Sequence, residues 1–212
     1  MNFTYLALGD SYTIGEQVDL AESFPYQTVQ ILRQTAVGAE SRRQGFCWQF
    51  AAPEVIAKTG WTTDELQAAI QQTTFLEQYD VVSLLVGVNN QYRGRSVTEF
   101  KDEFVQLLRQ AIAFAGGDPQ KVFVLSIPDW GVTPFAEGRE REQIAVEIDA
   151  FNEVCATASR DLLCTYIDIT GAQRADGNKA DFVAGDRLHP SAKEYAKWAE
   201  KLSEAIAKKF NG

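Results

Sequence analysis

Histidine and cysteine are scarce in this chain. Its 212 residues include one histidine, His189, and three cysteines, Cys47, Cys155 and Cys164, with no CxxC pair. Zinc sites need several such ligands at close spacing, and a disulfide framework needs an even set of cysteines. We therefore expect no metal, no cofactor and no disulfide framework. We interpret the cysteines as small apolar residues or free thiols of a reducing compartment.

The chain also lacks an excess of positive charge and long apolar runs. Lysine and arginine number 20 against 29 acidic residues, which gives a net charge of −9. Such a surface repels phosphate backbones and anionic lipids, which argues against a nucleic-acid partner. No segment has the length of a membrane span, and no signal-peptide pattern follows Met1. We expect no membrane insertion and a cytoplasmic protein, and the sequence leaves the oligomeric state open.

Strand-like and helix-like segments alternate along the chain. We expect strands at residues 3–8, 53–57, 81–86, 122–127 and 163–169, and helices at 23–36, from 62 onward, and at 96–115, 141–160 and 191–210. This alternation is typical of a doubly wound parallel sheet with helices on both faces. No repeat, low-complexity tract or linker interrupts it, so we expect a single domain over residues 1–212.

Several chemically active residues follow the ends of these strands. Ser11 follows the first strand, Gly60 the second and Asn89 the third, while Asp186 and His189 precede the last helix. Ligands of such sheets bind outside the carboxyl ends of the strands, so these pieces of sequence should meet at one edge. Imidazole is the side chain best suited to move protons near neutral pH. Asp186 can hold one ring nitrogen of His189 while the other faces the Ser11 hydroxyl.

Four blocks in the chain resemble the ordered motifs of the GDSL/SGNH hydrolases. They are Gly9-Asp10-Ser11, Gly60, Gly87-Val88-Asn89, and Asp186-Arg187-Leu188-His189-Pro190. The resemblance spans residues 9–190. It implies the SGNH hydrolase fold, a three-layer α/β/α architecture with a flavodoxin-like parallel sheet of about five strands. It also implies an ester hydrolase that works through an acyl-enzyme.

The resemblance assigns a role to each motif residue. Ser11 is the nucleophile, His189 the general base and acid, and Asp186 the orienting carboxylate. The oxyanion hole consists of the backbone N–H groups of Ser11 and Gly60 and the side-chain amide of Asn89. These residue types suit the chemistry, because a serine hydroxyl needs a base and a developing oxyanion needs preset donors. The nucleophile elbow GxSxG of the α/β-hydrolases does not occur.

The chain departs from the family pattern at three places. Tyr12 stands where leucine is usual, and Asn90 follows Asn89 where an acidic residue is frequent. Lys58 occupies the position, two residues before Gly60, where asparagine is frequent. We therefore expect the hydrogen bonds that brace the Asn89 loop to differ, and Gly60 has the least support among these site residues.

The substrate is expected to be a small-molecule ester. Tyr12, Trp130 and Phe135 are candidates for a substrate pocket, with core packing as the alternative for Trp130 and Phe135. The segment 129–135 offers aromatic surface but no anion-binding cluster, which favours short acyl esters, including O-acetyl groups on carbohydrates. The alternative is a longer acyl chain on a lysophospholipid or a thioester.

Functions of a different class are also consistent with part of the sequence. The hydroxyl-rich run that follows the first strand, Ser11-Tyr12-Thr13-Ile14-Gly15, is similar to the phosphate loop of flavodoxins, which bind FMN. That reading gives no role to Asn89, Asp186 or His189. An inactive binding module that kept the fold is a further alternative.

Overall fold

A five-stranded parallel sheet forms the centre of the molecule. The computed structural model describes residues 2–35 and 49–210. The sheet contains β2 (Tyr5–Gly9), β4 (Glu54–Ala57), β5 (Val81–Leu85), β6 (Val122–Leu125) and β7 (Thr165–Ile167), in the order β4-β2-β5-β6-β7. Counted along the chain, this is the 2-1-3-4-5 order of flavodoxin-like sheets. The prediction of a flavodoxin-like parallel sheet of about five strands is confirmed.

The register of the sheet aligns the carboxyl ends of its first three strands. Gly9, the last residue of β2, pairs with Ala57 at the end of β4 and with Leu85 at the end of β5. The chain segments that leave these strands therefore start side by side. This alignment brings the loops after β2, β4 and β5 to one edge of the sheet.

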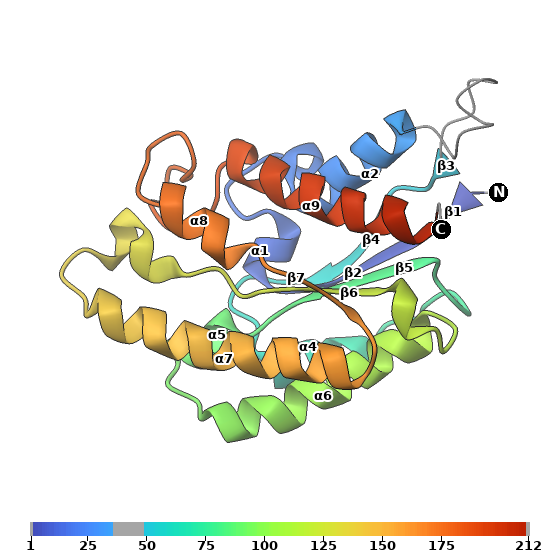
Figure 1. Cartoon of the computed structure of the whole chain (residues 1–212), viewed down its shortest axis with the longest axis horizontal. Helices are drawn as coiled ribbons and strands as arrows, with labels where there is room; N and C mark the ends of the chain where they lie inside the picture. The colour runs from blue at the N-terminus through green and yellow to red at the C-terminus, as the bar shows by residue number, and fades with distance from the viewer. Residues whose placement is uncertain (1, 36–48, 211–212) are drawn as a thin grey trace.

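Helices cover both faces of the sheet (Figure 1). On one face α2 (Phe24–Gln34) packs against α9 (Ala192–Phe210). On the other, α6 (Val97–Phe114) packs against both α4 (Thr63–Gln71) and α7 (Arg141–Asp161). Each of the longer helices buries one apolar stripe, such as Phe100, Phe104 and Leu107 of α6.

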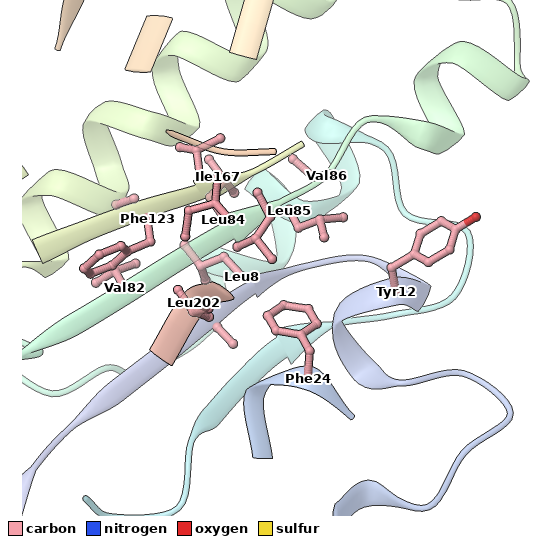
Figure 2. Packing of buried hydrophobic residues seen from close by; sticks show 14 of the residues in the cluster. Leu8, Tyr12, Phe24, Val82, Leu84, Leu85, Val86, Phe123, Ile167 and Leu202 are labelled. Carbon is pink, nitrogen blue, oxygen red and sulfur yellow. The ribbon is translucent and has the colours of Figure 1, made fainter. Parts of the chain in front are cut away.

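The apolar core lies between these layers. Figure 2 shows side chains of β2, β5 and β6 in contact with residues from the covering helices. Leu8, Leu84 and Val124, one from each central strand, have no exposed surface. Strands buried on both faces need apolar residues at successive positions, which explains the continuous runs in the sequence.

The structure also contains short elements that the sequence pattern did not predict. They are β1 (Asn2–Phe3) paired with β3 (Gln49–Phe50), the helices α1 (Ser11–Ile14), α5 (Val88–Tyr92) and α8 (Thr170–Asp176), and 3-10 turns at Leu20–Glu22, Pro119–Lys121, Trp130–Val132 and Pro134–Ala136. Segments of two to seven residues are too short to display a hydrophobic period. Ala36, the end of one predicted helix, and Cys47 lie outside the described residues.

Two remaining observations concern membranes and thiols. Within residues 2–35 and 49–210, no helix combines the length and apolar character needed to cross a bilayer. Cys155 is buried and Cys164 is half-buried, and both are free thiols.

We predict that Gly9→Ala destabilises the protein and lowers its activity. A Cβ at this position would overlap the carbonyl oxygen of Leu85 and the side chain of Thr13, so the backbone after β2 would have to move. Overpacking of this kind costs about 1–3 kcal/mol. Urea denaturation measures the loss. Gly185→Ala is the matched control, because a Cβ there meets no atom within 4 Å. Equal stability of the two variants would contradict the prediction.

Candidate active site

Ser11 is the first residue of a short helix that starts directly after β2. The side chain of Asp10 caps this helix, because Asp10 Oδ1 accepts a hydrogen bond from the backbone N–H of Tyr12 at 3.0 Å. The cap fixes the turn between strand and helix. As a result Ser11 lies at the carboxyl edge of the sheet, with 4% of its surface exposed.

Asp186 and His189 share a tight loop before α9. The backbone N–H of Ala184 donates to the His189 carbonyl at 2.8 Å, and the Arg187 N–H donates to the Ala184 carbonyl at 3.0 Å. Arg187 takes a left-handed backbone conformation with φ of 67°. Asp186 Oδ1 accepts hydrogen bonds from the backbone N–H groups of Leu188 and His189, both at 3.0 Å. These contacts fix the loop so that Asp186 faces one side of the His189 ring and Ser11 faces the other.

The three side chains form a continuous hydrogen-bonded chain. His189 Nδ1 lies 2.5 Å from Asp186 Oδ2, and His189 Nε2 lies 3.0 Å from Ser11 Oγ. Partial burial acts to raise the pKa of Asp186, but hydrogen bonds from the His189 ring and from two backbone N–H groups lower it below its usual value. A charged Asp186 holds the proton on Nδ1, which leaves Nε2 free to accept the Ser11 proton.

Gly60 and Asn89 lie beside Ser11 in the same cleft. Gly60 has φ of +83°, a conformation that favours glycine, and its carbonyl accepts a hydrogen bond from Arg93 Nη2 at 2.6 Å. Asn89 Nδ2 donates to the Trp61 carbonyl at 3.0 Å. An amide nitrogen carries two hydrogens, so the second remains available to a ligand.

Asn90 braces α5, the short helix that carries Asn89. Its side-chain oxygen accepts from the backbone N–H of Thr63 at 3.1 Å, and its Nδ2 donates to the Thr63 hydroxyl at 2.6 Å. That hydroxyl in turn donates to Glu103. Asparagine thus supplies both a donor and an acceptor at a position where the family often has an acid.

An aromatic wall completes the cleft, which we name the Ser11 cleft. Its volume is about 200 Å³, and it is lined by Ser11, Tyr12, Thr59, Gly60, Val88, Asn89, Tyr92, Trp130, Phe135, Leu188 and His189. Trp130 Nε1 donates to Gln91 Oε1 at 2.7 Å, which fixes the indole ring. The guanidinium of Arg139 lies 5.1–5.5 Å from the centres of the Tyr92, Trp130 and Phe135 rings and holds them together.

The structure therefore brings together every site residue that the sequence suggested. Ser11, Asp186 and His189 are in contact, and Gly60, Asn89, Tyr12, Trp130 and Phe135 line the same cleft. Sequence reasoning missed Tyr92, Trp61 and Thr63. Tyr92 carried a usable signal, since it lies three residues after Asn89, directly beyond the Gly87-Val88-Asn89 motif. Trp61 contributes only a backbone carbonyl, which no residue pattern reveals.

The described residues contain no group of three or more histidine, cysteine or carboxylate side chains that could hold a metal ion. The chemistry available in the Ser11 cleft is that of a hydroxyl, an imidazole, a carboxylate and preset N–H donors. This set suits nucleophilic attack on a carbonyl carbon.

A comparison with models of known protein families shows which family the chain belongs to. The model of the GDSL-like lipase/acylhydrolase family matches residues 7–197. The chain belongs to this family. As a GDSL hydrolase it is an enzyme that hydrolyses esters, as the sequence motifs predicted. This membership favours the hydrolase over the flavodoxin-like module and the inactive binding module.

Solved structures share the fold of this GDSL hydrolase at low sequence identity. A lipase/acylhydrolase from Enterococcus faecalis is 17% identical with a TM-score of 0.72, and the alignment covers 97% of this chain and 96% of that one. A G-D-S-L family protein from Veillonella parvula is 16% identical with a TM-score of 0.70 and coverage of 95% and 97%. An acetylxylan esterase from Geobacillus stearothermophilus is 17% identical with a TM-score of 0.70 and coverage of 96% and 94%. No curated protein matches the sequence.

We predict that Asp10 makes the GDSL hydrolase less stable as the pH rises from about 4 to 7. Burial raises the pKa of Asp10 to about 7, although hydrogen bonds from backbone N–H groups act to lower it. The folded state therefore holds this proton more tightly than the unfolded state. The resulting stabilisation is fully present below the pKa that Asp10 has in the unfolded state, and it is lost as the pH rises through 7. Each unit of difference between the folded and unfolded pKa values contributes about 1.4 kcal/mol to the free energy of unfolding.

Asp10→Asn tests this prediction. The variant keeps an oxygen acceptor for the Tyr12 N–H and removes the titration. The unfolding free energy of the variant relative to the original should increase between pH 5 and pH 8 by on the order of 3 kcal/mol. Urea denaturation at several pH values measures it. A constant difference across this range would show that Asp10 titrates normally.

Proposed function

We propose that the chain hydrolyses short acyl esters on small or carbohydrate-linked alcohols through an acyl-enzyme on Ser11. The observation that carries this proposal is the hydrogen-bonded chain from Asp186 through His189 to Ser11 at the Ser11 cleft. His189 Nε2 takes the Ser11 proton while Ser11 Oγ attacks the ester carbonyl carbon. The resulting oxyanion accepts hydrogen bonds from the N–H groups of Ser11 and Gly60 and from Asn89.

The same groups complete the catalytic cycle. His189 returns its proton to the leaving alcohol oxygen, which releases the alcohol and leaves the acyl group on Ser11. A water molecule then loses a proton to His189 and attacks the acyl carbonyl, and Ser11 departs with that proton. Asp186 keeps the imidazole in one tautomer and stabilises its charged form in both halves of the cycle.

The dimensions of the Ser11 cleft support a small acyl group. Its volume of about 200 Å³ is below the range of roughly 300–1,000 Å³ that is typical of sites for drug-sized ligands. No lysine or arginine is part of its lining; Arg93 is bound to the Gly60 carbonyl, and Arg139 lies over the rings of the aromatic wall. The fold shared with an acetylxylan esterase is consistent with an acetyl group on a carbohydrate.

A series of esters tests the substrate class. Hydrolysis of p-nitrophenyl esters from C2 to C16 should be fastest at C2–C4, and acetylated sugars should also be hydrolysed. A maximum at C10 or longer would instead support the alternative, a lysophospholipase or thioesterase that acts on longer acyl chains. No hydrolysis of any ester would refute the proposed function.

We predict that Ser11→Ala lowers kcat by on the order of 10³-fold or more, because no other hydroxyl contacts His189 Nε2 in the described residues. Thermal melting should stay close to that of the original protein. Mass spectrometry after treatment with a fluorophosphonate should locate the adduct on the peptide that contains Ser11. An adduct on another serine would contradict the assignment.

We predict that Asn89 acts mainly in the transition state. Asn89→Ala should lower kcat by roughly 10²–10³-fold with little change in KM, since a lost oxyanion donor weakens the transition state more than substrate binding. Asn89→Asp should be at least as damaging, because its carboxylate faces a developing negative charge. If Asn89 only shaped the turn, Asn89→Asp would be tolerated. Steady-state kinetics with thermal melts separates these outcomes.

A further inference from the structure

Tyr12 is the residue after the nucleophile, and its ring lies against the imidazole of His189. The two ring centres are 5.3 Å apart, with the planes tilted by 56°. On another side the ring contacts Trp198, at 6.0 Å between centres. Tyr12 is 3% exposed and lines the Ser11 cleft. Tyr12 belongs to the buried cluster, and in Figure 2 it lies to one side of the other labelled residues, with its hydroxyl directed away from them.

The hydroxyl of Tyr12 has no partner within the described part of the chain. Two other buried tyrosines use theirs, since Tyr5 shares a hydrogen bond with Ser83 and Tyr79 donates to Glu54, whereas the Tyr195 hydroxyl is sealed in the interior without a partner. The phenolic oxygen of Tyr12 is also not among the polar atoms sealed from solvent without a partner. A hydroxyl that is neither paired nor sealed keeps some exposed surface, and because Tyr12 lines the Ser11 cleft we take the cleft as the space that it meets.

This hydroxyl is held in its neutral form. Burial and the negative charges of Asp10, Asp186 and Asp129 raise the pKa of Tyr12 above its usual value. A neutral phenol can both donate and accept a hydrogen bond. In an otherwise mostly apolar cleft it is a group that distinguishes a polar ligand from an apolar one.

The position of His189 indicates which part of the substrate meets this hydroxyl. The imidazole gives its proton to the leaving alcohol oxygen, so the alcohol must lie against the imidazole. Tyr12 lies along the same ring. We propose that the Tyr12 hydroxyl binds a hydroxyl or ether oxygen of the leaving alcohol close to the ester, and so selects esters of polyols and sugars over esters of simple alkanols. This inference rests on the proposed function and adds the chemistry of the alcohol to it.

Two acetate esters with alcohols of three carbons test this role. Glycerol monoacetate carries free hydroxyls beside the ester, and propyl acetate carries none. The readout is the ratio of their kcat/KM values, measured by titration of the released acid. Removal of one neutral hydrogen bond should make this ratio about 3- to 10-fold smaller in Tyr12→Phe than in the original protein. Tyr26→Phe, on α2 and outside the lining of the Ser11 cleft, is the matched control and should leave the ratio unchanged.

Two outcomes would overturn the proposal about Tyr12. One is an unchanged or larger ratio in Tyr12→Phe, including an equal loss on both esters, which would mean that the hydroxyl supports the imidazole rather than the alcohol. The other is an original protein that hydrolyses p-nitrophenyl acetate but neither of the two alcohol esters. Hydrolysis of p-nitrophenyl acetate, with fluorophosphonate labelling of Ser11, tests the proposed function separately, so the two failures are distinguishable.

Discussion

The parallel pairing of β2 with β4 and β5 is the constraint on which the rest of the site depends. Gly9, Ala57 and Leu85 end their strands in register, and the loops that carry Ser11, Gly60 and Asn89 leave from this edge. A slip of one residue moves a strand by about 3.3 Å. A displacement of that size would break the 3.0 Å hydrogen bond between Ser11 Oγ and His189 Nε2, two residues that lie 178 positions apart in the sequence. Burial of the central strands on both faces therefore maintains the catalytic geometry.

A second set of contacts joins the loops after the strands. Asn89 is bound to the Trp61 carbonyl, and Asn90 is bound to the backbone and hydroxyl of Thr63. Two adjacent amides of α5 thus connect the segment after β5 to the segment after β4, which contains Gly60 and the start of α4. Because the Asn89 amide is bound to the segment after β4, this donor of the proposed oxyanion hole is held in place before substrate arrives. Donors that need no reorganisation contribute most to stabilising a transition state.

The sequence predicted the layered fold well because its long elements carry strong periodic patterns. The stripe of Phe100, Phe104 and Leu107 indicated a helix with one buried face, and that face is buried. The motifs around Ser11 and His189 located the candidate site because the carboxyl ends of parallel strands meet at one edge. The bracing contacts could not be predicted, since they depend on a backbone carbonyl at Trp61 and on the ring positions around Arg139. Neither follows from the spacing of residue types.

The segment that shapes the aromatic wall is attached to both halves of the catalytic apparatus. The backbone N–H of Phe135 donates to the Arg187 carbonyl within the loop of Asp186 and His189, and Trp130 is bound to Gln91, two residues after Asn89. Under the proposed function, the side chains that contact the substrate and those that move the proton are therefore connected by hydrogen bonds. A substitution that shifts the wall would also shift the loop of Asp186 and His189 or the helix that carries Asn89. Under the same proposal, a variant that accepts a larger substrate needs compensating changes in these neighbouring segments to keep its turnover rate.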